Sequence, residues 1–231
     1  MTRKQDSGES FVYRLAFWSG IAMLVIIPAQ ILVFSISPMP ESVYDWFTLF
    51  QTAPVAGFFH ADLFILVNNI LVAIIYLAFY QALKDINKGA MQVALVLGFI
   101  GIAAYLSSNR AFELRNLASR YATALSETEK TAIAGAGMAM LAGWQGTAFD
   151  AYYVLNGITL LIISVLLFRS DKFSRKSAIM GLAAAILMTV PSTAGSIGLV
   201  FSLLSLVPWY IFTIQFSRVF RRLGREAQIR I

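Results

Sequence analysis

Long apolar runs separated by short polar turns fill almost the whole chain. Each run approaches the roughly 20 residues that a helix needs to cross a bilayer. No segment alternates apolar and polar residues over about ten positions, as a membrane β-strand would. We predict an all-α, polytopic membrane bundle, one integral-membrane domain over residues 1–231, with six transmembrane helices. The spans are placed at about residues 15–36, 63–83, 90–106, 151–168, 177–192 and 197–217.

Composition agrees with this pattern and narrows the chemistry. The chain is 58% hydrophobic and 13% charged, whereas soluble domains carry about 25% charged residues. It has no cysteine, which excludes disulfides, thiolate metal sites and cysteine nucleophiles. Its single histidine, His60, would have to serve in any histidine-dependent site. We expect no cofactor and no metal.

One long polar stretch, residues 107–147, interrupts the apolar pattern between spans three and four, and we predict an extracytoplasmic helical hairpin there. The sequence from Ser126 to Glu129 has the form of a capping box, which predicts a helix start at about residue 127. Gly143 suits the left-handed end of that helix. Apolar residues of the first hairpin helix recur at helical spacing and predict one buried face: Phe112, Leu114, Leu117, Tyr121 and Leu125.

What this apolar face covers is left open by the sequence. The outer ends of the spans, the lipid headgroups and a partner are all compatible with it. The hairpin is therefore either a lid that completes the fold or a binding surface. The aromatic segment around Tyr44, Trp46 and Phe47 predicts a short helix at the membrane interface. Gly98 and Gly101 in span three favour close helix packing.

Charge distribution predicts the orientation. With six spans, 14 of the 18 Lys and Arg residues fall on the side of both termini, which is therefore the cytoplasmic side of the plasma membrane. These are Arg3, Lys4, Arg14, Lys84, Lys88, Arg169, Lys172, Arg175, Lys176, Arg218, Arg221, Arg222, Arg225 and Arg230.

Basic residues beside membrane spans favour lipid over nucleic acid as a partner. In the predicted basic cytoplasmic tail, 218–231, we expect Arg218, Arg221, Arg222 and Arg225 to contact anionic lipid. Besides membrane lipids, a homo-oligomer or a membrane-protein partner is compatible with the sequence, and no nucleic acid is expected.

Polar residues at the outer ends of the spans form the candidate ligand-binding cluster, because polar groups in membrane spans cost free energy. Asp62 and Asn69 are seven residues apart and share a helix face. Asp62 and Asp150 have an alternative role as caps of helix starts. The full cluster is His60, Asp62, Asn69, Arg110, Glu113, Asp150, Tyr153 and Asn156.

A short segment of span two resembles the second-span motif of rhomboid proteases, His-x-x-x-x-His followed by Asn. His60 and Asn69 match, but Ile65 replaces the second histidine. The chain also lacks the Gly-x-Ser-Gly serine in a suitable span and the histidine of the sixth span. A serine without a base is a poor nucleophile. Proteolysis is therefore excluded, and an inactive distant relative remains an alternative.

A broader resemblance extends over most of the chain. Its features are Arg14-Leu-Ala, Ser119-Arg-Tyr-Ala, the run Ala134-Gly-Ala-Gly-Met-Ala-Met-Leu, Gly146-Thr-Ala-Phe and Leu203-Leu-Ser-Leu-Val-Pro. The chain is similar to a family of bacterial multi-pass membrane proteins known only as a domain of unknown function. The resemblance implies a helical bundle in the bacterial inner membrane and no substrate or catalytic residue.

These observations favour a non-enzymatic role, with a lipid, a small molecule or a partner protein bound under the hairpin. A transporter or channel component is the first alternative, although the two halves show no clear internal repeat. An intramembrane enzyme is the second. We expect no catalytic residue.

Overall fold

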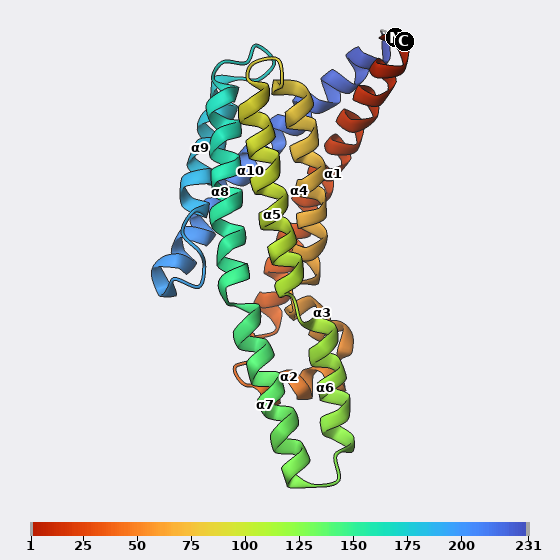
Figure 1. Ribbon diagram of the computed structural model, residues 1–231, viewed down its shortest axis with the longest axis vertical. Coiled ribbons are helices and arrows are strands. Elements are labelled where there is room, and N and C mark those ends of the chain that lie inside the picture. Colours follow the sequence, from red (N-terminus) through yellow and green to blue (C-terminus); the bar gives the residue numbers. More distant parts are fainter. Residues whose placement is uncertain (1, 230–231) are drawn as a thin grey trace.

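The computed structural model describes the fold of residues 2–229 and the side chains of residues 8–229, so the side chains of Arg3 and Lys4, and Arg230, lie outside it. The described chain forms ten helices and no strand (Figure 1). They are α1 (Thr2–Ile36), α2 (Val43–Thr52), α3 (Pro54–His60), α4 (Leu63–Leu83), α5 (Lys88–Ser108), α6 (Ala111–Thr123), α7 (Glu127–Trp144), α8 (Thr147–Leu167), α9 (Arg175–Met188) and α10 (Gly195–Ile229).

Five helical stretches are long and apolar enough to cross a membrane. They are Gly8–Ile36, Leu63–Leu83, Lys88–Thr123, Glu127–Leu167 and Gly195–Ile229. The predicted span at residues 177–192 corresponds to α9, which has 14 residues. At 1.5 Å per residue α9 is about 21 Å long, shorter than the bilayer core of about 30 Å.

Although α9 is short, residues 189–194 continue along α8 to its beginning. There the Thr193 hydroxyl donates a hydrogen bond to Asp150, and Ser192 Oγ lies 3.4 Å from Tyr153 Oη. The turn between α8 and α9 lies at the other end of α8 (Figure 1). The segment between α8 and α10 therefore returns along the full length of α8.

The apolar helices pack around a core rich in phenylalanine. Phe79 of α4 contacts three rings of α10, those of Phe212, Phe216 and Phe220, at centroid distances of 5.0–5.7 Å. The predicted close packing at Gly98 is present, because a Cβ there would lie 2.6 Å from the Tyr76 ring. Tyr76 belongs to α4, and a Cβ at Gly101 would lie 2.4 Å from the amide nitrogen of Asn156 on α8, so α5 packs closely against both helices.

Helices α2, α3, α6 and α7 form a separate unit at the far end of the bundle, which we call the head (Figure 1). The head has its own apolar core, contributed by α2, α6 and α7. The predicted short helix is present as α2, and its Trp46 and Phe47 rings are buried in this core. α2 therefore supplies the surface that the apolar faces of α6 and α7 cover.

The predicted apolar face of α6 is correct only in part. Leu114 and Leu117 are buried, and Tyr121 packs against the core from its edge. Phe112 of α6 is 73% exposed, and Leu125 is 98% exposed because it lies in the turn after α6 has ended at Thr123. α6 is also a separate helix, since extended backbone at Asn109 ends α5.

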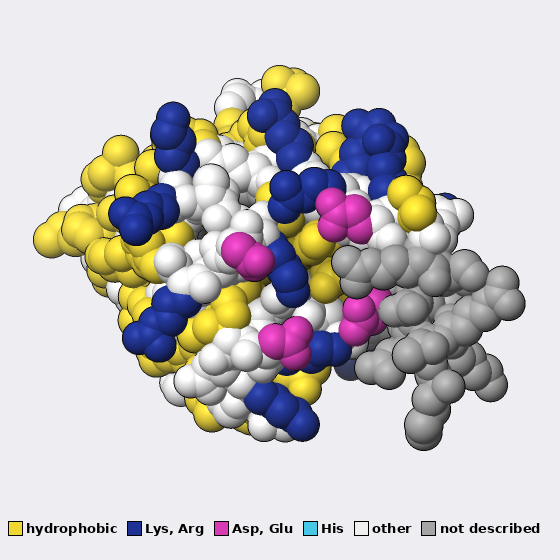
Figure 2. Space-filling model, turned by 90° about the horizontal axis from the view of Figure 1, so that it is seen from above, with side chains coloured by type: hydrophobic (Ala, Val, Ile, Leu, Met, Phe, Trp, Pro, Cys, Tyr) yellow, Lys and Arg dark blue, Asp and Glu magenta, His cyan; other side chains and the backbone are white. Residues whose placement is uncertain are grey.

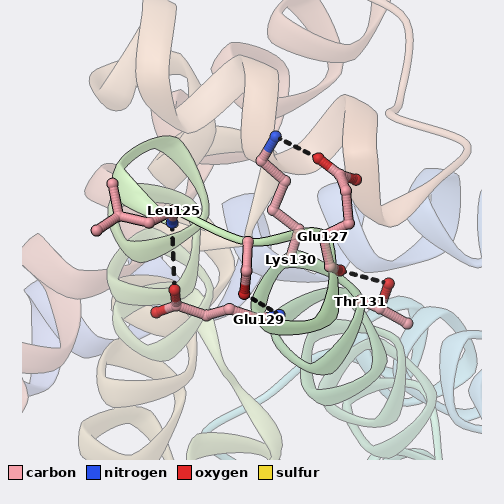
Figure 3. Close-up of polar contacts among 6 residues, drawn as sticks. Leu125, Glu127, Glu129, Lys130 and Thr131 are labelled. Carbon is pink, nitrogen blue, oxygen red and sulfur yellow. Dashed lines mark hydrogen bonds and ion pairs between the residues drawn. The ribbon is translucent and has the colours of Figure 1, made fainter.

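The start of α7 follows the prediction at Ser126, with one difference (Figure 3). Ser126 Oγ accepts a hydrogen bond of 3.2 Å from the Glu129 N–H, as a capping box requires. The Glu129 carboxylate instead accepts from the N–H of Leu125, one residue before the cap, at 3.3 Å. α7 ends at Trp144, and Gly143 is not left-handed as predicted.

The predicted basic tail is a helical continuation of α10, which runs to Ile229. Figure 2 shows Lys and Arg side chains gathered around the end of the molecule where the described termini meet. The loops after α4 and α8 lie at the same end (Figure 1).

Candidate functional site

The site is built where the head meets the bundle, at the break between α3 and α4. Asp62 is the residue at this break and has a left-handed backbone with φ of 63°. It is the one non-glycine residue with positive φ in the described chain. Such a conformation costs about 1–2 kcal/mol, least for Asp and Asn, and concentrates at functional positions.

The Asp62 carboxylate faces into the protein instead of capping α4. Its Oδ2 accepts a 2.9 Å hydrogen bond from the Tyr105 hydroxyl of α5. Asp62 precedes α4 as its N-cap residue, but its side chain makes no capping hydrogen bond. The capping alternative is therefore wrong for Asp62. Asp150 does lie in the first turn of α8, where an acid complements the helix dipole, although the N-cap residue is Gly146.

Electrostatics at Asp62 are dominated by its burial. Burial raises the pKa of Asp62 to about 7, against smaller lowering effects of the Tyr105 hydroxyl and the Trp144 indole. The Trp144 N–H lies near the carboxylate without making a hydrogen bond of normal geometry. A carboxyl with this pKa gains and loses a proton near neutral pH.

Asn69, two turns further along α4, is fully buried and lies beside the Tyr152 hydroxyl. Neither its amide oxygen nor its amide nitrogen makes a hydrogen bond of normal geometry. Tyr152 in turn packs against Tyr105, with a ring centroid distance of 4.8 Å. Asp62 and Asn69 therefore belong to one buried group, linked through Tyr105 and Tyr152.

Asn156 of α8 extends this group into the bundle, and, unlike in Asn69, both its amide oxygen and its amide nitrogen make a hydrogen bond. Its Oδ1 accepts from the Tyr76 hydroxyl at 2.8 Å, and its Nδ2 donates to the Tyr152 carbonyl at 3.0 Å. These two asparagines are thus similarly buried but differ in hydrogen bonding.

His60 ends α3 beside Asp62 and is fully buried. Its Nε2 lies 3.0 Å from Ser37 Oγ, and its ring stacks on Phe34 at 5.8 Å. Burial lowers the pKa of His60, so the ring stays neutral near pH 7. Its Nδ1 has no hydrogen-bond partner, so the ring lacks the orienting group that serine–histidine catalysis uses.

We call His60, Asp62, Asn69, Tyr105 and Trp144 the polar junction. His60, Asn69 and Trp144 each carry buried side-chain polar atoms without a hydrogen-bond partner. Gln30, which donates to the Phe59 carbonyl, has a further unpaired oxygen, and so does Asn68. Leaving such an atom unpaired costs about 1–3 kcal/mol, and native proteins have few of them.

Five of the eight predicted residues lie outside this junction. Asn156 and Tyr153 adjoin it through Tyr152, whose ring centroid lies 5.3 Å from that of Tyr153. Asp150 and Tyr153 tie the start of α8 to the turn before α10. Arg110 and Glu113 form an ion pair of 3.6 Å on the head, where they line a groove of about 460 Å³ between α6 and α7.

Sequence reasoning missed Tyr105 and Trp144. From its position near the end of a span, Tyr105 is indistinguishable from an ordinary tyrosine at the membrane interface. Its partner Asp62 is 43 residues away, and no local spacing relates the two. Trp144 reads as the apolar end of a helix, and only the packing of α7 against the bundle places its N–H near a carboxylate.

Comparison with known proteins gives a family and no further relative. No curated protein and no solved structure matches the chain. The family described as Domain of unknown function (DUF4386) matches residues 20–220, which is most of the 231-residue chain. The protein therefore belongs to the DUF4386 family of proteins of unknown function.

Proposed function

We propose that this membrane protein works by non-enzymatic binding of a small polar molecule at the polar junction. One observation carries the proposal, namely the buried and unpaired polar atoms of His60, Asn69 and Trp144 around the strained Asp62. A ligand with both hydrogen-bond donors and acceptors would satisfy these atoms. A carboxyl that gains a proton near pH 7 favours a neutral or cationic ligand over an anion.

The head favours a small ligand at the junction over a large one beneath α6 and α7. α2 packs directly against the apolar sides of α6 and α7, and a Cβ at Gly137 would lie 2.6 Å from Val43. A lipid chain or a protein segment has no room between α2 and these two helices. A small molecule at the junction instead touches α3, α4, α5 and the end of α7.

The test compares two buried asparagines. Asn69→Leu removes unpaired polar atoms, so we expect unchanged or increased thermal stability of the purified protein. Asn156→Leu breaks two satisfied hydrogen bonds and should lower stability. Small molecules that copurify with the wild type, detected by mass spectrometry, should be absent from Asn69→Leu and retained by any folded Asn156 variant.

Two results would contradict the proposal. If Asn69→Leu destabilises the protein as much as Asn156→Leu does, Asn69 has a structural role. If the wild type and Asn69→Leu carry the same small molecules, the junction is not the binding site.

The proposal includes an orientation with six crossings and both termini in the cytoplasm of a bacterial cell. Support comes from the basic end around the described termini and from the contact of Thr193 with Asp150. This contact favours a full crossing between α8 and α10, although α9 itself is short. The head then lies outside the cytoplasmic membrane.

A transporter or channel component is the second candidate, favoured by polar contacts that reach inward. Asp62, Tyr105, Tyr152, Asn156 and Tyr76 follow one another from the junction into the bundle. Proton flux into proteoliposomes under an imposed pH gradient would distinguish this role. Flux lost in Asp62→Asn supports transport, whereas no flux above protein-free vesicles supports binding alone.

An enzymatic role would centre on Ser37 and His60, whose side chains have the spacing of a nucleophile and its base. Because the free His60 Nδ1 lacks an orienting carboxylate, we expect Ser37 not to react with a fluorophosphonate probe. Labelling of the wild type that Ser37→Ala abolishes would contradict the non-enzymatic proposal.

A further inference from the structure

A groove of about 560 Å³ lies between α1 and α10, at the end of the molecule opposite the head. Three arginines from two helices line it: Arg14 of α1, and Arg221 and Arg225 of α10. Within the described part of the chain, none of the three forms a salt bridge, since the ion pairs found there involve other basic residues. The groove therefore concentrates positive charge.

The packing of α1 against α10 holds this groove in shape. Ser10 Oγ donates a 3.0 Å hydrogen bond to the Gly224 carbonyl, and Tyr13 stacks on Phe220 at 5.9 Å. Gly224 lets the stem of Arg14 cross α10, because a Cβ there would lie 3.2 Å from Arg14 Cγ. The arginines are thus carried by a fixed helix pair.

Apolar surface adjoins the arginines on the α1 side. Phe17 lies under the Arg221 guanidinium at 5.6 Å, and Trp18 lines the groove while remaining 63% exposed. Exposed apolar side chains continue along α1 at helical spacing: Leu15, Ile21 and Val25. A ligand that fits this surface has an anionic head and a long apolar tail.

We propose that the groove between α1 and α10 is a binding site for an anionic phospholipid. The phosphate lies among Arg14, Arg221 and Arg225, and an acyl chain follows Trp18 along α1. Guanidinium groups bind phosphate oxygens through paired hydrogen bonds. The site lies at the end of a membrane-spanning helix, where phosphates of the headgroup layer are found.

This assignment divides four arginines of the tail into two pairs. Arg221 and Arg225 line the groove, whereas Arg218 and Arg222 do not. Arg222 instead donates to the Lys172 carbonyl at 2.8 Å and lies 3.7 Å from Glu226. Both pairs are four residues apart on the same helix, so each provides a control for the other.

The experiment measures lipid binding by native mass spectrometry of the full chain in detergent. Phosphatidylglycerol is compared with phosphatidylcholine for the wild type, Arg221→Gln/Arg225→Gln and Arg218→Gln/Arg222→Gln. We expect the first double variant to bind phosphatidylglycerol about 30-fold more weakly, because one basic residue near an anionic surface strengthens binding about five-fold. The second should change binding less than about two-fold, and Arg14→Gln should weaken it about five-fold.

Trp18 offers a second readout, because the other three tryptophans, Trp46, Trp144 and Trp209, are buried. Phosphatidylglycerol brominated on its acyl chains should quench the fluorescence of the wild type. Quenching should be much smaller in Trp18→Phe and in the Arg221→Gln/Arg225→Gln variant, at the same lipid concentration.

Three results would overturn the site. Equal losses in both double variants mean diffuse attraction of the basic tail, and equal binding of both lipids means no recognition of charge. Competition by glycerol 3-phosphate at the lipid's own concentration means a soluble phosphate ligand. Thermal unfolding of each variant shows whether it is folded, and Arg14→Gln tests the site from the other helix if a double variant unfolds.

Discussion

The Tyr105 hydroxyl donates a 2.9 Å hydrogen bond to the carboxylate of Asp62, joining α5 to the break between α3 and α4. Both residues are buried, and each comes from a different hydrophobic stretch of the chain. This bond links the bundle to the head at a point where the backbone is strained. Its removal should therefore have effects that reach beyond one side chain.

Tyr105→Phe should destabilise the protein by about 1–3 kcal/mol, because it leaves a buried carboxyl without its donor. The ring and its packing on Tyr152 remain. Thermal unfolding of the purified protein in detergent at pH 8 measures the effect. Tyr44→Phe, at an exposed tyrosine of the head, is the control and should change little. Equal stability of Tyr105→Phe and wild type would show that the bond contributes nothing.

The titration of Asp62 predicts a pH dependence of stability. Its pKa of about 7 in the folded protein exceeds the value of about 3.9 for an unfolded Asp. Between these values the folded state binds a proton that the unfolded state lacks. The free energy of unfolding should thus fall by up to about 1.4 kcal/mol per pH unit from about pH 4 to pH 7, then change little.

Asp62→Asn isolates the contribution of Asp62 to the pH dependence of stability, because Asn tolerates a left-handed backbone and does not titrate. As the pH rises from about 4 to about 7, the wild type should lose stability relative to Asp62→Asn, so the unfolding free energy of the variant minus that of the wild type should increase. Taking the difference removes the opposing contribution of His60, whose lowered pKa makes the fold less stable in acid. Parallel curves for the two proteins would refute a titrating Asp62. The nearby Tyr105, Tyr152 and Tyr153 do not carry charge in this pH range.

Two glycines provide opposite tests of helix packing. A Cβ at Gly101 would lie 2.4 Å from the Asn156 amide nitrogen, whereas a Cβ at Gly135 would meet nothing within 4 Å. Gly101→Ala should destabilise by about 1–3 kcal/mol through overpacking between α5 and α8. Gly135→Ala should stabilise α7 by about 0.5–1 kcal/mol through helix propensity. The same sign for both would contradict the packing of α5 on α8.

The sequence predicted where the helices lie along the chain better than which helices pack against each other. Hydrophobic periodicity and length placed α4, α5 and α8 within a few residues, because lipid demands about 20 apolar positions whatever the neighbours are. The start of α7 was predicted because Ser126 caps it locally. The packing inside the head was not predicted, because a tryptophan such as Trp46 is equally suited to a membrane interface and to a protein core. Only the fold places α2 against α6 and α7.

The candidate site was predicted in the same uneven way. Asp62 and Asn69 lie in one buried group, but Asp62 precedes α4 with a left-handed backbone, so the spacing along one helix does not by itself account for it. The bond from Tyr105 joins two helices, and a single sequence carries no signal for such a pair. Arg110 and Glu113 were placed in the site because the sequence does not show the break at Asn109, after which both residues belong to the start of α6 in the head.

Single cysteines test the orientation and the number of crossings, because the native chain has none. Cysteines at Thr128 and Gln145 should react with a membrane-impermeant maleimide on intact cells, since both are exposed on the head. A cysteine at Ser174 should react only after lysis. A cysteine at Thr193 should react on intact cells if the segment between α8 and α10 crosses the membrane.

Protection of the cysteines at both Thr193 and Ser174 on intact cells would mean that this segment does not cross. Labelling at Ser174 but not at Thr128 would mean that the orientation is inverted. Reaction of all four sites after lysis confirms that each is accessible.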